Sequence, residues 1–549
     1  MPNWWRKAED TQAEAVHAGA GSHEGESGMV FLEALKKRRS EGLIPVIPDI
    51  KCFSPKDGDL MRGRDPVEIA KTLEKAGACV LSVVTEEREF RGSMELLRAV
   101  CAAVRVPVLR KDFIETVRDL EETKETGAAA ILLMYSCLGK EKLEFLYREA
   151  LQMGLLPFVE THTGEELSYA EQLGAPLIGI NNRNILLLER DGGDVSHAAG
   201  LLTGLRDHLR GGDAAEDPAC AEPFLVVESG LQCGADVRTA VRSGADAALV
   251  GTAILREEDP AAMYRAMSRP CDLKICGLMN REGAELCVRN HVDMLGFVTE
   301  YPADVPWNLQ REETKALLES CRAAGKTEKS GGYAKTCIVT GGSTEKVLSL
   351  ARELRPDAVQ LHGRESLQET AETARALKEE GILLIRSVPG TPALREEMFG
   401  TADLQQIAEL LGRTETSAIL LDSRDAGNAA SGGGSILTAD LSDTHTPAGR
   451  KAFCSVSGMR PEAGDGLLLV IGGGLTADNV REGIRRFAPD MVDVMTGVED
   501  LPGIKSGEKL SRLVHSLEEK MWSPGPHPVY NSSIRNGRRI CYGISGRTV

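Results

Sequence analysis

The sequence contains 549 residues, which is too long for one hydrophobic core and favours about two to four domains. Hydrophobic residues make up 42% of the chain and charged residues 27%, as in ordinary globular proteins. The formal net charge of −17 argues against nucleic acid as the main partner, because binding a phosphate backbone needs a basic surface. The net charge does not exclude small phosphorylated ligands, because these are bound by the local geometry of a site.

The cysteines show no metal-binding pattern, and the N-terminus shows no targeting pattern. The 13 cysteines include no CxxC pair and no Cys/His cluster at zinc spacing. We therefore expect reduced thiols in a cytoplasmic protein, without a metal site. No apolar run approaches the roughly 18 residues that span a membrane. Residues 1–28 lack a signal-peptide stretch and are expected to form a flexible leader.

Short apolar segments recur along the first half of the chain, and the segments between them, such as 65–78, have helical periodicity. Strands that alternate with helices indicate an α/β fold with a parallel sheet, and eight such units indicate a closed (β/α)8 barrel. The expected strands are 45–51, 79–85, 107–113, 129–135, 156–162, 177–183, 224–230 and 247–253.

The second half repeats this scheme, so we expect two tandem TIM barrels, at 29–268 and 269–522. The expected strands of the second barrel are 273–277, 294–298, 335–341, 358–363, 382–388, 418–423, 467–473 and 491–497. Other segments fit neither barrel. They are the loop-like insertions 210–223, 323–332 and 424–452, and a tail of unknown role at 523–549.

Polar residues stand at the ends of several strands of the first barrel, where the active site of such a barrel is built. Two lysines, two acids and an amide that converge on one mouth suit general acid–base catalysis. The candidates are Asp49, Lys51, Lys111, Glu160, Asn181, Arg183, Glu228 and Ser229. The alternative is that such charges, for instance Arg110 and Asp112, form structural ion pairs that close the barrel top.

Small residues follow the last two strands of each barrel. ESGL (228–231) precedes VGTA (250–253), and IGGGL (471–475) precedes MTGV (495–498). Backbone N–H groups of such turns can reach a phosphate, although glycines also end strands for conformational reasons. Because the pair of motifs occurs in both halves, we expect each barrel to bind a phosphorylated ligand.

The second barrel has its own candidates for acid–base chemistry. Lys274, Cys276 and Gly277 lie at its first strand, His362 at its fourth and Asp422 at its sixth. A thiol and a carboxylate on opposite sides of a mouth can act as base and acid if their pKa values allow it. A buried cysteine is otherwise a small core residue.

The motifs in the first half resemble indole-3-glycerol phosphate synthases across about residues 30–268. They are, in order, VIPDIKCFSP, LSVVTEEREFRGS, VLRKDFI, FVETH, IGINNRN, VVESGL and LVGTAI. Motifs across about 272–515 resemble phosphoribosylanthranilate isomerases. These are LKICGL, DMLGFV, AVQLHG, AILLDS, GGGLTADNV and VDVMTGVEDLPGIKS. The tandem is similar to the bifunctional tryptophan-biosynthesis fusion, with the synthase first.

The resemblance implies two consecutive reactions without a metal or an organic cofactor. The second barrel would isomerise N-(5-phosphoribosyl)anthranilate to 1-(2-carboxyphenylamino)-1-deoxyribulose 5-phosphate (CdRP). The first barrel would close the indole ring of CdRP with loss of CO2 and water. The partners implied are these small substrates, and two barrels in one chain are compatible with a monomer.

In the synthase motifs, the resemblance implies that Lys111 is the general acid and Glu160 the later base. Lys51 would pair with the substrate carboxylate or shuttle protons beside Asp49, and Asn181 would orient hydroxyl groups. Other residues would bind the substrate. Ser54 and Phe90 would line the anthranilate pocket, Arg183 and Ser229 would be polar supports, and Gly230, Gly251 and Thr252 would hold the phosphate.

In the isomerase motifs, Cys276 would be the general base and Asp422 the general acid that opens the ribose ring. The implied substrate-binding residues are His362, Gly473, Gly474, Thr496 and Gly497.

Three of the places where the sequence departs from the family patterns concern the expected sites most directly. Asp49 stands where the synthases usually have glutamate. The segment EYPADVPWNL (300–309) replaces an arginine-containing S-P-R segment of the isomerases, and residues 431–435 replace their G-G-T-G loop.

Two alternatives to the bifunctional enzyme remain open. One is an active synthase fused to an isomerase-like barrel that is inactive or has another substrate, which the replaced arginine favours and the retained Cys276 and Asp422 oppose. The other is a non-catalytic scaffold that binds phosphorylated ligands, which gives no reason to retain Lys51, Lys111 and Glu160.

Overall fold

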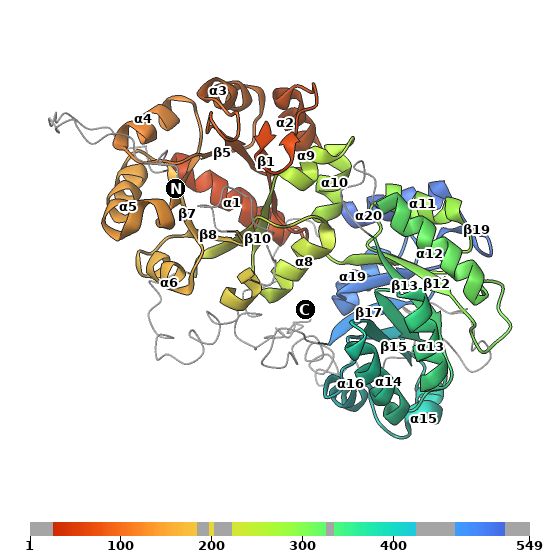
Figure 1. Ribbon diagram of the computed structural model, residues 1–549. Helices are drawn as coiled ribbons and strands as arrows, with labels where there is room; N and C mark the ends of the chain where they lie inside the picture. The colour runs from red at the N-terminus through yellow and green to blue at the C-terminus, as the bar shows by residue number, and fades with distance from the viewer. Residues whose placement is uncertain (1–25, 184–196, 203–221, 326–333, 424–466, 522–549) are drawn as a thin grey trace, which may run out of the picture.

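A computed structural model describes residues 26–183, 197–202, 222–325, 334–423 and 467–521. These residues form two closed barrels, each of eight parallel strands that alternate with helices (Figure 1). The prediction of two tandem TIM barrels is confirmed, and each expected strand has its counterpart. Most of the expected leader, tail and insertions lies outside the described residues, as does the segment 431–435.

In the first barrel, strands pair in chain order and β1 closes the sheet against β10. The strands are β1 (Val46–Ile50), β4 (Leu81–Val84), β5 (Val108–Lys111), β6 (Ala130–Met134), β7 (Leu156–Thr161), β8 (Leu177–Asn181), β9 (Phe224–Glu228) and β10 (Ala247–Val250). The helices are α1 (Glu26–Ser40), α2 (Pro66–Lys75), α3 (Met94–Ala103), α4 (Val117–Glu125), α5 (Tyr135–Gln152), α6 (Gly164–Gln172), α8 (Gly234–Ser243), α9 (Thr252–Arg256) and α10 (Pro260–Met267). A small hairpin follows β1, formed by β2 (Phe53–Ser54) and β3 (Gly58–Asp59).

The second barrel closes in the same way, with β11 paired to β18. Its strands are β11 (Asp272–Ile275), β12 (Met294–Val298), β13 (Lys335–Thr340), β14 (Ala358–Leu361), β15 (Leu383–Pro389), β16 (Ala418–Asp422), β17 (Leu468–Gly472) and β18 (Met491–Val494). Its helices are α11 (Arg281–Arg289), α12 (Arg311–Gly325), α13 (Thr344–Leu354), α14 (Leu367–Glu379), α15 (Pro392–Phe399), α16 (Leu404–Gly412), α19 (Val480–Phe487) and α20 (Gly507–Glu518). After β18 come η3 (Thr496–Val498), β19 (Glu499–Leu501) and β20 (Ile504–Lys505).

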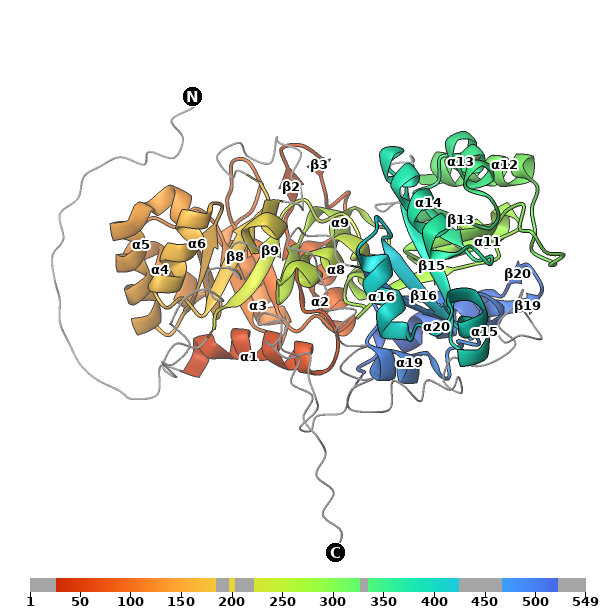
Figure 2. The same ribbon diagram turned by 90° about the horizontal axis from the view of Figure 1, so that it is seen from below.

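Burial explains why the strand segments are apolar along their whole length. Helices cover the outside of each barrel and side chains fill the inside, so both faces of a strand are removed from water. The apolar face of α1 adds Phe31, Leu32 and Leu35 to the inner core of the first barrel, where they contact the residues around Ile47 and Phe158. Figure 2 shows α1 across the end of this barrel opposite the β2–β3 hairpin. The helix therefore closes the bottom and leaves the carboxyl ends of the strands open.

Local sequence signals set where the helices begin. Asp65 caps α2 by accepting a hydrogen bond from the backbone N–H of Val67, and Pro66 occupies the first helical position. Thr116 and Asp119 cap each other's backbone at the start of α4. Within the described ranges, no helix has the length and hydropathy needed to cross a membrane.

Buried ion pairs join the two barrels. Arg238 on α8 contacts Asp272, which begins β11, and Asp293, which precedes β12. Arg269 Nη2 lies 2.7 Å from Glu518 Oε1 at the end of α20. These contacts lie at the amino ends of the second barrel's strands, so its mouth lies at the end away from the contact.

Candidate active sites

The ammonium group of Lys111 lies at the mouth of the first barrel, between two carboxylates. Lys111 ends β5, and its Nζ lies 2.8 Å from Glu228 Oε2 at the end of β9 and 3.2 Å from Glu160 Oε2 in β7. Both glutamates are buried, whereas the lysine is partly exposed. The three strands that carry these residues are distant in sequence. Closure of the barrel brings their ends to one rim and so forms the cluster.

The proton affinities in this cluster follow from burial and charge. Burial raises the pKa of Glu228 to about 8, repulsion from Glu160 acts in the same direction, and Lys111 lowers it. Burial by itself would lower the pKa of Lys111, but Glu228, Glu160 and Asp49 together raise it above its ordinary value. The mouth therefore combines a lysine that keeps its proton with a carboxyl group that titrates near neutral pH, which suits proton transfer.

Asp49 and Lys51, from the first strand and its end, are both buried at this mouth. Asp49 Oδ1 accepts a hydrogen bond of 2.6 Å from Ser82 Oγ, and its charge contributes to the raised pKa of Lys111. Lys51 Nζ lies 5.6 Å from the centroid of the Phe90 ring, within the range of a cation–π contact. The shorter carboxylate of Asp49 thus has a partner on β4 and lies within electrostatic reach of Lys111.

Ser54 and Phe90 lie on neighbouring loops. The backbone N–H of Phe53 donates to the carbonyl of Phe90 over 3.1 Å, which ties the β2–β3 hairpin to the loop after β4. Ser54 is fully buried, and its Oγ donates to Asp57 Oδ2 over 3.3 Å.

Asn181 orients Glu160. Its Nδ2 donates a hydrogen bond of 3.0 Å to Glu160 Oε1, while its Oδ1 accepts one of 2.9 Å from the backbone N–H of Arg183. The next residue, Asn182, donates from Nδ2 to the backbone carbonyl of Ser229 over 2.9 Å. The loops after β8 and β9 are therefore joined at the rim.

The residues predicted to hold a phosphate in the first barrel follow β9 and β10. Ser229 and Gly230 have φ angles of 68° and 75°, a left-handed turn that glycine adopts readily. Gly251 packs against β1, because an added Cβ would lie 3.1 Å from the Asp49 carbonyl oxygen. Thr252 begins α9 directly after it. All four residues are partly exposed.

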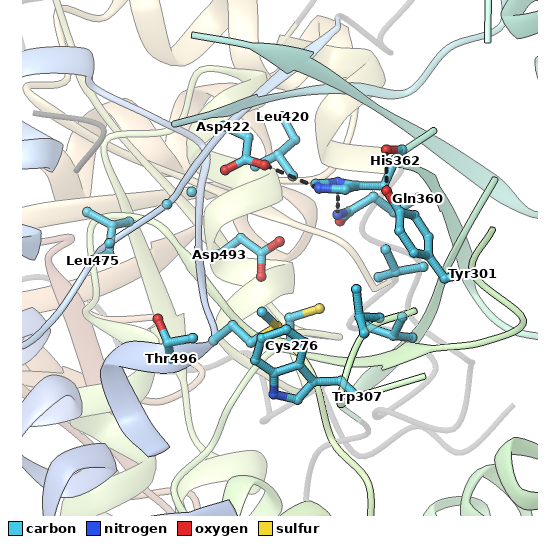
Figure 3. Close-up of a pocket in the computed structure, with 17 residues that line it drawn as sticks. Cys276, Tyr301, Trp307, Gln360, His362, Leu420, Asp422, Leu475, Asp493 and Thr496 are labelled. Atoms are coloured by element: carbon cyan, nitrogen blue, oxygen red, sulfur yellow. Dashed lines mark hydrogen bonds and ion pairs between the residues drawn. The ribbon is translucent and has the colours of Figure 1, made fainter. Parts of the chain in front are cut away.

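A cavity with about 730 Å³ of empty space opens at the mouth of the second barrel (Figure 3). The cavity is lined by Cys276, Val298, Tyr301, Val305, Trp307, Val339, Gln360, His362, Leu420, Asp422, Gly472, Gly473, Gly474, Leu475, Asp493, Met495 and Thr496.

Cys276 lies at the floor of this cavity, next to a buried ion pair. Lys274 Nζ lies 2.7 Å from Asp493 Oδ2, and the lysine side chain is fully buried. Burial raises the pKa of the Cys276 thiol, while the charge of Lys274 acts in the opposite direction. The thiol thus has a cation beside it that favours its anionic form.

Asp422 and His362 form the opposite side of the cavity (Figure 3). His362 Nε2 lies 3.2 Å from Asp422 Oδ2, and Gln360 Nε2 lies 3.3 Å from His362 Nδ1. Tyr301 Oη donates to the backbone carbonyl of His362 over 3.0 Å. In Figure 3, Asp493 lies between Asp422 and Cys276, so a ligand in the cavity would meet acid–base groups on both sides.

The predicted phosphate residues of the second barrel form one edge of the cavity. Gly473 and Gly474 have φ angles of 94° and 63° and lie beside Thr496 in the lining. Gly497 follows in η3 but is not among the lining residues, and an added Cβ there would collide with the Leu475 carbonyl oxygen. Gly497 thus permits close packing of two turns.

The first barrel identifies the family. The family model for indole-3-glycerol phosphate synthase matches residues 6–267. The synthase from Pyrococcus abyssi is 41% identical over 233 residues, covering 42% of this chain and 93% of that protein. The chain belongs to the indole-3-glycerol phosphate synthase family. The synthase from Geobacillus kaustophilus is 40% identical over 230 residues, which cover 83% of it.

The second barrel matches another family. The model for N-(5'-phosphoribosyl)anthranilate isomerase matches residues 454–516, so the synthase-family chain is a fusion with an isomerase-type barrel. The crystal structure of phosphoribosyl anthranilate isomerase from Thermotoga maritima covers 45% of this chain and 98% of its own, at 26% identity and a TM-score of 0.34. The prediction of a tandem of these two families is confirmed.

Some residues at the two mouths had no assigned role in the sequence. Glu228 was one of several strand-end candidates, whereas Asp493 was not singled out; a lone carboxylate in the apolar strand Met491–Val494 is the signal that could have found it. Arg110 and Asp112 form an ion pair of 3.0 Å, and Arg110 also donates a hydrogen bond to Thr123. For these two residues, the structure agrees with the alternative of a structural ion pair. Among the described residues, no group of three or more histidine, cysteine or acidic side chains is arranged to hold a metal ion.

Proposed function

We propose that this chain catalyses two consecutive steps of tryptophan biosynthesis, with the isomerase step in the second barrel and the synthase step in the first. The observation that carries the proposal is the position of Lys111 between Glu160 and Glu228 at the first mouth. A scaffold that only bound phosphate would not need a lysine held between two buried carboxyl groups, because burying charge is costly.

In the proposed synthase step, the ring carbon that carries the carboxylate attacks the ketone carbon of CdRP. Lys111 gives its proton to the ketone oxygen as the new C–C bond forms. Loss of CO2 restores the aromatic ring, Lys51 gives the second proton with which the hydroxyl group leaves as water, and Glu160 removes the last proton. Asn181 supports this role because it orients the Glu160 carboxylate, and Lys51 would also pair with the substrate carboxylate before it is lost.

In the proposed isomerase step, Asp422 protonates the ribose ring oxygen so that its bond to C1 breaks. Cys276 removes the proton from C2, and the resulting enol tautomerises to the ketone of CdRP. The cation of Lys274 supports the thiolate form of Cys276. The backbone beside Gly473, Gly474 and Thr496 would hold the phosphate.

We further propose that the barrels divide between residues 268 and 269 and that the chain acts as a monomer. The buried contacts of Arg238 and Arg269 across this junction support one two-barrel unit within a single chain.

Separate assays of the two half-reactions test the proposed function. The purified full chain should convert N-(5-phosphoribosyl)anthranilate to CdRP, and added CdRP to indole-3-glycerol phosphate. Conversion of CdRP alone would support the alternative of an active synthase fused to an inactive isomerase-like barrel. If neither substrate is converted, the enzyme function is wrong and the scaffold alternative takes its place.

A further inference from the structure

The segment between β12 and α12 forms an aromatic wall of the second cavity. We call Tyr301, Val305 and Trp307 the aromatic wall; all three line the cavity, and in Figure 3 Tyr301 lies on the side away from Leu475. The isomerase mechanism proposed above assigns none of them a role. Aromatic and apolar side chains next to acid–base groups are the kind of lining that takes an aromatic ring.

Hydrogen bonds fix the loop that carries this wall. Asn308 accepts a bond of 2.8 Å from the backbone N–H of Tyr301 and donates one of 3.0 Å to its carbonyl. The backbone N–H of Glu300 donates to the carbonyl of Leu309 over 2.9 Å, which closes the base of the loop. The wall is therefore formed before a ligand arrives, and binding need not order it.

Trp307 donates a hydrogen bond to a buried ion pair on the side away from the cavity. Its Nε1 donates to Glu499 Oε1 over 3.1 Å, and the same oxygen lies 2.6 Å from Lys505 Nζ. All three residues are buried. Because the Glu499 charge is compensated by Lys505, the indole is held in one orientation without adding net charge beside the cavity.

Gly277 brings the indole close to the proposed base. Gly277 follows Cys276 with a φ angle of 70°, and an added Cβ would lie 3.1 Å from Trp307 Cδ1 and 2.9 Å from Met495 Sδ. Only a residue without a side chain permits this approach. The indole therefore packs over the backbone directly after the thiol.

The charged side chains in the described lining of this cavity do not favour a second anion near the aromatic wall. Asp422 and Asp493 are among the described lining residues, which include no lysine or arginine. Lys274 is paired with Asp493 beneath the floor, and Lys505 with Glu499 behind the indole. A carboxylate on a bound ring would gain no ion pair from this lining, whereas the ring itself gains a flat apolar contact.

On the basis of the isomerase function proposed above, we propose that Trp307 selects the substrate's aromatic ring by its flat face and that the ring's carboxylate contributes little. Trp307 and Tyr301 contact the ring in this arrangement, and Glu499 is a positioning residue that acts through the indole. The phosphate lies at the opposite edge, so the reacting carbons come between Cys276 and Asp422.

Steady-state kinetics with two substrates test the inference. The full-length chain is assayed with N-(5-phosphoribosyl)anthranilate and with N-(5-phosphoribosyl)aniline, which lacks the carboxylate. We expect wild-type kcat/KM values within about tenfold of each other. Trp307→Leu should raise KM for both substrates by about tenfold and change kcat by less than about threefold, since a stacked aromatic contact has roughly this value.

Two further variants separate recognition from folding. Trp307→Phe keeps a flat ring and should stay within about threefold of the wild-type KM. Phe487→Leu is the matched control, because Phe487 is a buried aromatic residue of the same barrel that does not line the cavity; it should leave KM unchanged. A wild-type preference above about tenfold for the carboxylate substrate, or an unchanged KM in Trp307→Leu, would overturn the inference alone. A wild-type chain that converts neither substrate would overturn the isomerase function with it.

Discussion

Each barrel contains a lysine next to buried carboxylates, but the two ammonium groups differ in access. Lys111 contacts two glutamates, and 18% of its side chain is exposed at the first mouth. Lys274 contacts Asp493, and its side chain is 0% exposed. In both, neighbouring acids raise the pKa above its ordinary value despite burial.

This difference shows that similar ion pairs can have different functions in two barrels of the same fold. Lys111 stands at the end of its strand and can reach a ligand, so it suits direct proton transfer. Lys274 lies inside its strand beneath Cys276, so it can act only through Asp493 and the thiol. Four experiments test these two clusters.

The largest effect is expected for Lys111→Met. Loss of the proposed general acid should lower the synthase kcat by about 10³-fold, while the isomerase step keeps its rate because the second cavity is in the other barrel. Lys140→Met is a matched control, because Lys140 is an exposed lysine of the same barrel. A synthase rate within about tenfold of the wild type would contradict direct proton transfer by Lys111.

A smaller loss of rate is expected for Lys274→Met, together with a loss of stability. Removing the cation leaves the Asp493 charge uncompensated in a buried site, which should cost about 3–5 kcal/mol of the unfolding free energy. The isomerase kcat should fall by about 10²-fold, since the thiolate of Cys276 loses its neighbouring cation. Urea unfolding and the two half-reaction assays measure these effects.

The double variant Lys274→Met/Asp493→Asn sharpens this test. It should recover part of the stability, because no buried charge is left alone, and the isomerase rate should stay low. Equal stability of the single and double variants would show that the ion pair does not account for the loss.

The last prediction concerns the pH dependence that Glu228 contributes to stability. Burial raises its pKa from 4.5 to about 8, so the folded chain holds this proton more tightly than the unfolded chain. This contribution to stability is therefore present at low pH and is lost as pH rises from about 5 to about 8. Glu228→Gln cannot titrate and should lack this component. Urea unfolding at several pH values tests it, and parallel curves for the two proteins would contradict the raised pKa.

Much of the fold could be predicted from the sequence, because strands buried on both faces leave a local apolar signal. Segments such as Ala130–Met134 show it plainly. The residues at the mouths could be named as candidates, since the carboxyl ends of barrel strands share one rim. Their pairing could not be predicted. Lys111 and Glu228 are 117 residues apart, and Lys274 and Asp493 are 219 apart.

The sequence by itself determined the alternation of strands and helices, the two families and the candidates at the strand ends. Each depends on local patterns, such as apolar runs, caps and short motifs. Only the tertiary structure decided which charges meet, which lysine reaches the solvent and how Trp307 is anchored. A proton affinity depends on burial and on the distance to other charges, and barrel closure sets both between strands that are far apart in the chain.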